Sequence, residues 1–371
     1  MKLFRIPREP KTYLDVLKLL AIVLVVFNHS GANGFRMYTE VAQQPQHLLL
    51  MCFSAFVKIA VPLFFMASGA LLLRRDESYG KTLSQRVLRF AAILVAVSAF
   101  FYWRSLGKGE AFSLPDFLDG LYRNKLTGHL WYLYSYVCML LLLPFLRRLA
   151  RGMTLREALL LAVVYQVAQL LTVADYALYQ GAAAHTGYLS FFVAADYVVY
   201  PLLGYFIDNY RADEEREEVL YILLFLGAAA LLLTGVLMDW RMTLDGGWSS
   251  ANQEAYMGRL SLLPAVAVFY GMKRLFARVC SGRAASVLFV LGSCTFGVYL
   301  FDPVWRQLTQ SVRTLLGPVV GLFAATLAQT LCAVVLGLAA MLAWKCLWGG
   351  VRLLGERVRN AARGEEKPAA G

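Results

Sequence analysis

The stretch YLDVLKLLAIVLVVFNHSG, from Tyr13 to Gly31, decides the fold. It is apolar apart from a few polar side chains towards its two ends, and a helix of about 20 such residues crosses a hydrocarbon core of about 30 Å. Similar runs recur as far as Trp348, so that 59% of the 371 residues are hydrophobic and 16% are charged. Soluble domains carry about 25% charged residues. In lipid, an apolar run of this length can form all its backbone hydrogen bonds within itself if it is a helix. The sequence therefore predicts an all-α polytopic membrane protein.

Ten apolar segments are long enough to cross a bilayer, and an even number puts both chain ends on the same side. The sequence therefore predicts a membrane-embedded domain over residues 1–348 and a polar cytoplasmic tail over residues 349–371. The ten predicted spans cover residues 13–31, 47–73, 87–103, 129–146, 157–178, 188–208, 219–238, 256–276, 285–301 and 319–346.

The Lys and Arg residues are divided unequally between the two sides of these spans. Of the 36, the N-terminal segment, the C-terminal tail and the loops on their side hold 25, the opposite loops hold 8, and Lys18, Lys58 and Arg259 lie inside spans. Cations concentrate in cytoplasmic loops. The sequence therefore predicts that both termini are cytoplasmic. The first run lacks a cleavage site and exceeds the apolar region of a signal peptide, so it is interpreted as a retained helix.

Composition also argues against several classes of function. The net charge of +12 comes from short clusters between apolar runs, where topology and anionic lipid explain it, so nucleic-acid binding is not predicted. The six cysteines form no CxxC pair and no His/Cys ligand spacing, so neither a metal site nor a disulfide framework is predicted.

The first span carries ionisable groups where lipid makes them costly. Lys18 and His29 are 11 residues apart, which is close to three helical turns, so they share one face and lie about 16 Å apart along the axis. In one interpretation Lys18 reaches to the cytoplasmic surface and His29 ends the helix. In the other, Lys18 holds an anionic ligand and His29 does proton chemistry. Asp15, three residues before Lys18, would neutralise it.

Lys18 and His29 form a pattern of one Arg or Lys, ten intervening residues and a His. Further motifs follow one another along nearly the whole chain: VPLFFMASGALLL (61–73), RVLR with Arg86 and Arg89, HLWYLYSYVCMLLLLPFLRRL from His129, YPLLGYFI from Tyr200, and TFGVYLFDP (295–303). This ordered set resembles the acyltransferase-3 family of membrane-bound acyltransferases. The resemblance is closest to the compact branch that modifies surface glycans and has no fused extracellular domain.

Two positions depart from the family pattern. Lys18 stands where many members have Arg, which keeps the charge but loses the two-pronged guanidinium. Asp302 precedes Pro303 where many members have His, so the sequence leaves open any role tied to that His.

The resemblance implies transfer of an acyl group, most simply acetyl, from cytoplasmic acyl-CoA to a sugar hydroxyl of a surface polysaccharide or lipid-linked glycan. It implies a multi-pass enzyme of the bacterial cytoplasmic (inner) membrane, with acyl-CoA as donor and no metal. His29 would be the general base, or in a variant the carrier of an acyl-histidine intermediate. The cations expected to hold the donor phosphates are Lys18, Arg74, Arg75, Arg86 and Arg89.

Candidate acceptor-side residues are His129, Lys58 and Arg259. His129 begins the fourth span, where a His beside aromatic residues is also an ordinary interfacial feature. Lys58 and Arg259 would bind a glycan phosphate, and the intramembrane carboxylates are interpreted as their counter-ions. These are Asp175, Asp196 and Asp302.

Two other functions are compatible with such a helical bundle. One is a transporter or exporter of a glycan or lipid-linked precursor, since carriers also place charges inside the membrane. The other is a membrane subunit that is active only with a partner protein. The sequence leaves open the acyl group, the acceptor sugar and its hydroxyl, and the oligomeric state.

Overall fold

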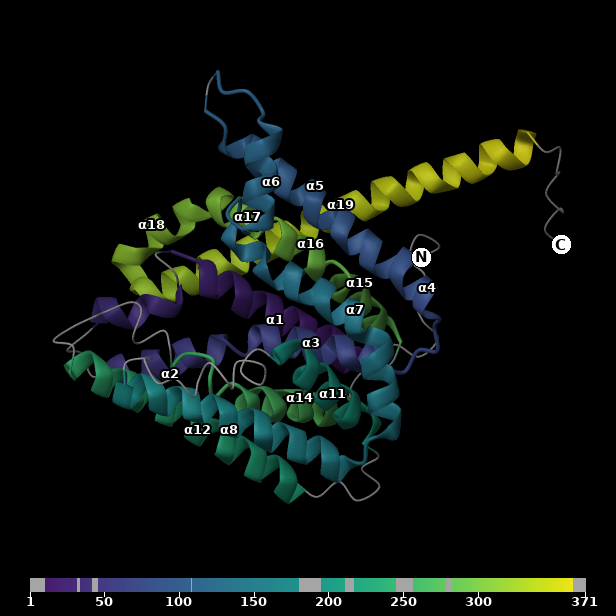
Figure 1. Ribbon diagram of the computed structural model, residues 1–371. Helices are drawn as coiled ribbons and strands as arrows, with labels where there is room; N and C mark the ends of the chain where they lie inside the picture. Colours follow the sequence, from purple (N-terminus) through teal and green to yellow (C-terminus); the bar gives the residue numbers. More distant parts are fainter. Residues whose placement is uncertain are drawn as a thin grey trace. The chain divides into compact units, whose positions relative to one another are not determined.

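The computed structural model describes residues 11–31, 34–41, 46–107, 109–179, 195–210, 217–244, 256–277 and 282–362, with side chains as far as Gly349 (Figure 1). Within these ranges the chain is helical and has no strand, which confirms the predicted all-α fold. The chain divides into two compact units, Met1–Val26 with Phe276–Gly371 and Phe27–Leu275. Cys280 and residues 363–371 of the predicted tail lie outside the described residues.

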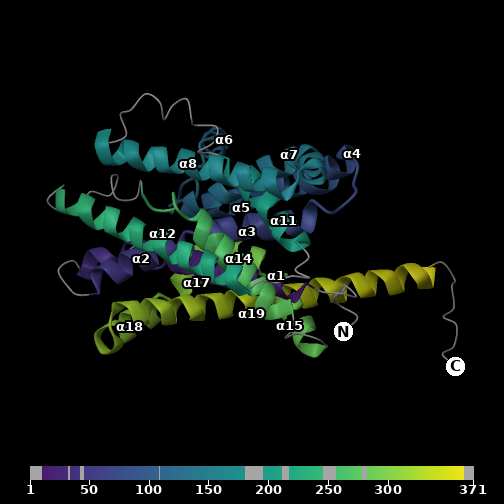
Figure 2. The ribbon, with the colours of Figure 1, turned by 90° about the horizontal axis from the view of Figure 1, so that it is seen from below.

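The first unit is built around one long C-terminal helix. Helix α19 (Leu322–Ala362) is packed by the three shorter helices before it, and Figure 2 shows α18 beside its first part. A turn at Gly321, whose φ of +82° favours glycine, reverses the chain between α18 and α19. The other helices of this unit are most of α1 (Thr12–His29), α15 (Arg283–Gly292), α16 (Thr295–Leu300), α17 (Asp302–Leu308) and α18 (Gln310–Val320).

The second unit holds the remaining helices, beginning with the last residues of α1. Three of its described elements are not α-helical, and two of these are the 3₁₀ helix η1 (Gly34–Val41) and the π-helical turn η2 (Leu83–Val87). The others are α2 (His47–Val57), α3 (Ala60–Leu72), α4 (Tyr79–Thr82), α5 (Leu88–Ser105), α6 (Leu114–Tyr122), the 3₁₀ helix η3 (Gly128–Leu130), α7 (Trp131–Gly152), α8 (Leu155–Tyr179), α11 (Asp196–Asn209), α12 (Glu217–Leu244) and α14 (Leu262–Ala277).

Eight helical segments in the described part of the chain are long and apolar enough to cross a membrane. They correspond to eight of the ten predicted spans. The other two predicted spans contain α11 and α14, which have 14 and 16 helical residues and are therefore shorter than the roughly 20 that a full crossing takes. The number ten and the orientation of the chain remain predictions.

The predicted span 47–73 consists of two helices. Helix α2 ends before Lys58 and α3 begins at Ala60. The backbone amides of Lys58 and Ile59 still donate hydrogen bonds to the carbonyls of Ala55 and Phe56. The break therefore leaves neither of these amides without a hydrogen bond. The break places Lys58 at the junction of two helices rather than within one.

Two segments that carry family motifs pack against each other backbone to backbone. A Cβ atom on Gly69 of α3 would overlap the backbone of Pro201 in α11, and one on Gly204 of α11 would overlap that of Met66. Small residues allow such close helix crossings in membranes. The motifs VPLFFMASGALLL and YPLLGYFI therefore share one tightly packed interface.

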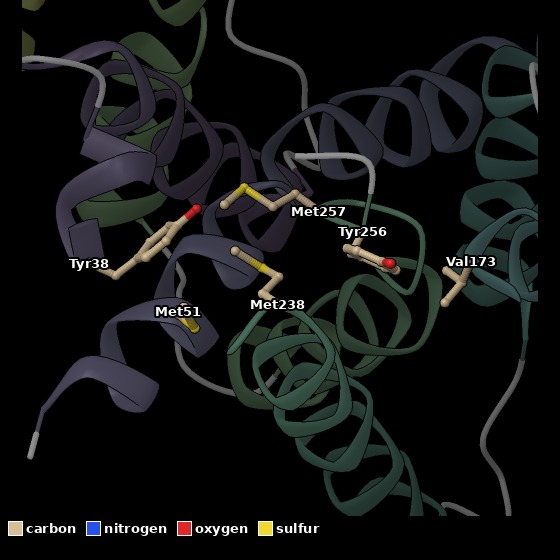
Figure 3. Packing of buried hydrophobic residues seen from close by; sticks show 6 residues of the cluster. All are labelled: Tyr38, Met51, Val173, Met238, Tyr256 and Met257. Atoms are coloured by element: carbon tan, nitrogen blue, oxygen red, sulfur yellow. The ribbon is translucent and has the colours of Figure 1, made fainter. Parts of the chain in front are cut away.

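A second packing centre joins segments from several parts of this unit (Figure 3). Tyr38, Met51, Met238 and Tyr256 are each at most 1% exposed. They come from η1, α2, α12 and the turn that precedes α14. In Figure 3, Met238 and Met257 lie between the two tyrosine rings, a place that suits the flexible methionine side chain.

Candidate functional site

The predicted catalytic residue His29 is the last residue of α1 and is half-buried. Lys18 lies on the same unbroken helix, which supports the predicted spacing of about 16 Å between them. The side chain of Lys18 is 20% exposed and forms an ion pair of 2.6 Å with Asp15. Asp15 is buried and lies against Gly292, where an added Cβ would come 2.8 Å from its carboxylate. The neutralisation of Lys18 by Asp15 that the sequence suggested is therefore present.

The predicted donor-binding arginines of the second unit differ in their surroundings. Arg74 lies 3.7 Å from the buried carboxylate of Asp208, and Arg75 lies 3.8 Å from Glu77. Arg86 donates two hydrogen bonds to Glu77, from Nε at 2.9 Å and from Nη2 at 2.7 Å.

Arg89 is the exception, since its exposed side chain has no partner in the part of the chain that the structure describes. The four arginines nevertheless come from one stretch between the end of α3 and the start of α5. They form a cationic surface on what the topology predicts to be the cytoplasmic side.

Arg147 is a member of this group that the sequence analysis counted only as a cytoplasmic cation. It is 4% exposed, and it donates from Nη2 to the Glu77 carboxylate at 2.9 Å. Its other N–H groups bond to the carbonyls of Leu72 and Glu77 and to the hydroxyl of Thr82. The motif from His129 contains Arg147, but its pairing with a residue 70 positions away is not visible in local spacing.

Glu77 is held as an ion by these cations. The hydrogen bond from Arg86 is the largest cause that lowers the pKa of Glu77 to about 2, with Arg147 acting in the same direction and burial opposing both. The carboxylate therefore stays charged at every physiological pH.

The predicted acceptor-side residues Lys58 and Arg259 come from two chain segments that lie next to each other. A Cβ atom on Gly258 would come within 3.8 Å of the Lys58 side chain, so the turn carrying Arg259 lies against the α2–α3 break. The φ of +84° at Gly258 favours glycine at this turn. Arg259 donates to Gln169 at 3.2 Å and acts electrostatically on Asp196, which agrees with the interpretation of Asp196 as a counter-ion.

Beside Arg259 lies a buried polar network that the sequence analysis did not identify. The Tyr165 hydroxyl donates to Asp196, and the Tyr200 hydroxyl bonds to Ser261 at 3.0 Å. Ser261 in turn donates to the carbonyl of Gly258 at 2.6 Å. Tyrosine is only weakly polar on hydropathy scales, so Tyr165 and Tyr200 did not stand out within apolar segments and only Asp196 gave a sequence signal for this network.

An apolar groove of about 560 Å³ opens next to the network, between α8, α11, α12 and α14. Its walls are aliphatic and aromatic side chains, and Gln166 contributes an amide. Gln166 also donates to the Arg259 carbonyl at 3.3 Å. The groove therefore connects an apolar surface with the polar residues around Arg259.

The other candidate residues have structural partners. His129 is 9% exposed, is hydrogen-bonded through Nδ1 to Thr127 at 2.7 Å, and stacks edge-on with Phe101. Asp302, in the first unit, is fully buried and accepts from Arg306 on both oxygens at 3.1 Å. Asp302 thus has a cation of its own one helical turn away.

No group of three or more metal-binding side chains occurs within the described residues, and the five cysteines described there are free thiols. A family model described as an acyltransferase domain matches residues 11–344. No curated protein and no solved structure matches the chain.

Proposed function

Since this chain belongs to the acyltransferase-3 family, we propose that it transfers an acetyl group from cytoplasmic acyl-CoA to a sugar hydroxyl of a surface polysaccharide or lipid-linked glycan. The family match over residues 11–344 carries the acyl-transfer part of this proposal. The bacterial cytoplasmic membrane is the proposed location, because the chain has several apolar helices and a surplus of cations on one side of them.

The cationic surface after α3 supports acyl-CoA as the donor. Three guanidinium groups surround the single carboxylate of Glu77, and Arg89 adds an exposed charge. A surplus of arginine attracts phosphate groups and binds them through two-pronged hydrogen bonds. Lys18, on the helix that ends at His29, is the proposed further contact for the donor.

His29 is the proposed general base. In this reaction the imidazole takes the proton of the sugar hydroxyl while the hydroxyl oxygen bonds to the thioester carbonyl carbon. The carbon–sulfur bond then breaks, and the imidazolium returns the proton to the CoA thiolate. In the variant with an acyl-histidine intermediate, the imidazole itself attacks the thioester before the sugar does.

The acceptor side of the proposal rests on Lys58, Arg259 and the groove. Lys58 and Arg259 lie on neighbouring segments, and cations inside an apolar bundle suit a phosphate. The adjoining apolar groove suits a hydrocarbon chain. This combination supports a lipid-linked glycan as acceptor. His129 is the remaining acceptor-side candidate, at the start of α7.

The decisive variant is His29→Gln in the purified protein. Glutamine keeps approximate size and hydrogen bonding but is not a base, so turnover should fall by about 10²- to 10⁴-fold while acetyl-CoA binding is unchanged. His129→Gln is the matched comparison: as an acceptor-side candidate it should raise KM for the acceptor and leave kcat within about tenfold of the wild-type value, since it is not the proposed base. Transfer by His29→Gln at more than about a tenth of the wild-type rate would remove His29 from catalysis.

Mass spectrometry of surface glycans from cells with and without the gene distinguishes a transferase from an exporter. Loss of one acetyl unit per repeat supports the transferase. Loss of the whole glycan supports export instead.

A further inference from the structure

The two arginines of the RVLR motif lie in different environments. The Arg86 guanidinium is 21% exposed and uses both Nε and Nη2 to bind Glu77. Arg89 is exposed and has no hydrogen bond or ion pair to any residue of the described ranges. One member of the pair is therefore held by the protein, and the other presents its whole guanidinium to a ligand.

The backbone separates the two side chains. Arg86 belongs to the π-helical turn η2, whereas Arg89 belongs to the regular helix α5 that follows it. A π-turn contains an additional residue, which changes the direction of the side chains after it, and such turns are frequent at functional sites. Here it directs Arg86 towards the loop that carries Glu77.

Arg147 fixes that loop from the other side. Its guanidinium bonds to the carbonyl at the end of α3, to the backbone and carboxylate of Glu77, and to Thr82 in α4. One buried side chain of α7 thus holds the loop between α3 and α4, which contains Arg74 and Arg75. A buried charge with several hydrogen bonds sets geometry more than it adds stability.

We propose that Arg147 and Glu77 are positioning residues of the donor site: they hold Arg86 and the loop in place, and Arg89 contacts the donor phosphates. This inference rests on the proposed function, because the ligand is the acyl-CoA of that reaction. Of the two arginines of the RVLR motif, Arg86 is held by Glu77, whereas Arg89 binds the donor.

The experiment measures acetyl-CoA affinity by calorimetry and melting temperature for purified variants in detergent. Arg89→Ala should weaken acetyl-CoA binding by about tenfold or more, the loss expected for a charge-assisted hydrogen bond, with an unchanged melting temperature. Arg86→Ala and Glu77→Gln should lower the melting temperature. Their double variant should be hardly worse than Glu77→Gln alone, since that change already breaks the contact with Arg86. Arg148→Ala, an exposed cation next to Arg147, is the control and should change neither quantity.

Arg147→Lys distinguishes positioning from simple structural support. Lysine keeps the charge but cannot hold Leu72, Glu77 and Thr82 together, so KM for acetyl-CoA should rise severalfold with kcat nearly unchanged. If Arg86→Ala and Arg89→Ala lose the same acetyl-CoA affinity and both melting temperatures are unchanged, this inference is wrong but the proposed function is not affected. Absence of acetyl-CoA binding in the wild-type protein would overturn the proposed function as well.

Discussion

Gly69 and Pro201 lie in direct backbone contact, so that α3 and α11 cross without room for a single additional carbon atom on Gly69. Gly69→Ala should therefore force the helices apart and destabilise the protein by about 1–3 kcal/mol or more, as overpacking does. Gly204→Ala should act in the same way against Met66. Gly152→Ala, where an added Cβ meets nothing, is the control. Thermal unfolding in detergent measures the difference, and equal melting temperatures for all three variants would contradict the predicted clash.

Asp15 competes with any anionic ligand for Lys18. Asp15→Asn removes the ion pair at 2.6 Å and leaves the lysine charge available, so acetyl-CoA should bind more tightly. Lys18→Arg should be tolerated, because arginine keeps the charge and adds a fork suited to phosphate. Lys18→Glu should weaken donor binding and leave acceptor binding intact. Calorimetry with acetyl-CoA tests the series, and an unchanged affinity in Lys18→Glu would exclude Lys18 from the donor site.

The pKa of about 2 for Glu77 sets the pH range in which its ion pairs stabilise the fold. A depressed folded-state pKa gives a contribution that is complete above the unfolded-state value of 4.5 and is lost as pH falls towards 2. The difference in melting temperature between wild type and Glu77→Gln should therefore be constant from about pH 8 to about pH 5 and shrink below that. A difference that already disappears near neutral pH would contradict the assigned ion pairs.

The apolar groove offers a test of the acceptor. Ala162 lines it, and Ala162→Trp should fill it, so that transfer to a lipid-linked glycan falls severalfold while transfer to a water-soluble sugar of the same structure is unaffected. Leu160→Trp changes an exposed position on the same helix that is not part of the groove and serves as the control. Equal rates for the two tryptophan variants with the lipid-linked acceptor would rule out the groove as its binding site.

Topology is testable with single cysteines in a cysteine-free background. The cation distribution predicts that a cysteine at Arg151 reacts with a membrane-impermeant reagent only from the cytoplasmic side. A cysteine at Ala183, which lies outside the described residues, should react only from the opposite side. Labelling of both positions from one side would disprove the arrangement of ten spans.

The sequence predicted the helical class and most of the spans because both depend on runs of apolar residues, which are local. The same holds for Lys18 and His29, whose relation follows from one helix. The break at Lys58 was missed because the residues on either side of it are as apolar as those within a helix. Hydropathy does not reveal where one helix ends and the next begins.

The contacts that organise the donor surface could not be predicted in this way. Arg147 and Glu77 are 70 residues apart, and only the packing of α7 against the loop after α3 brings them together. A count of cytoplasmic cations treats Arg147, Arg148 and Arg89 alike, whereas the structure buries the first and exposes the other two. The tyrosines beside Asp196 were missed for a related reason, since a phenol adds little polarity to a hydropathy window.

Helix α19 continues without interruption for 41 residues, whereas the part long and apolar enough to cross a membrane covers Leu322–Gly349. At about 1.5 Å per residue, the helix continues for about 20 Å from there to Ala362. A small rigid domain fused in helical register after Ala362 would be held at a defined angle to the span. Such a fusion gives a membrane-embedded chain of 41.4 kDa an external feature by which single particles can be aligned in electron microscopy.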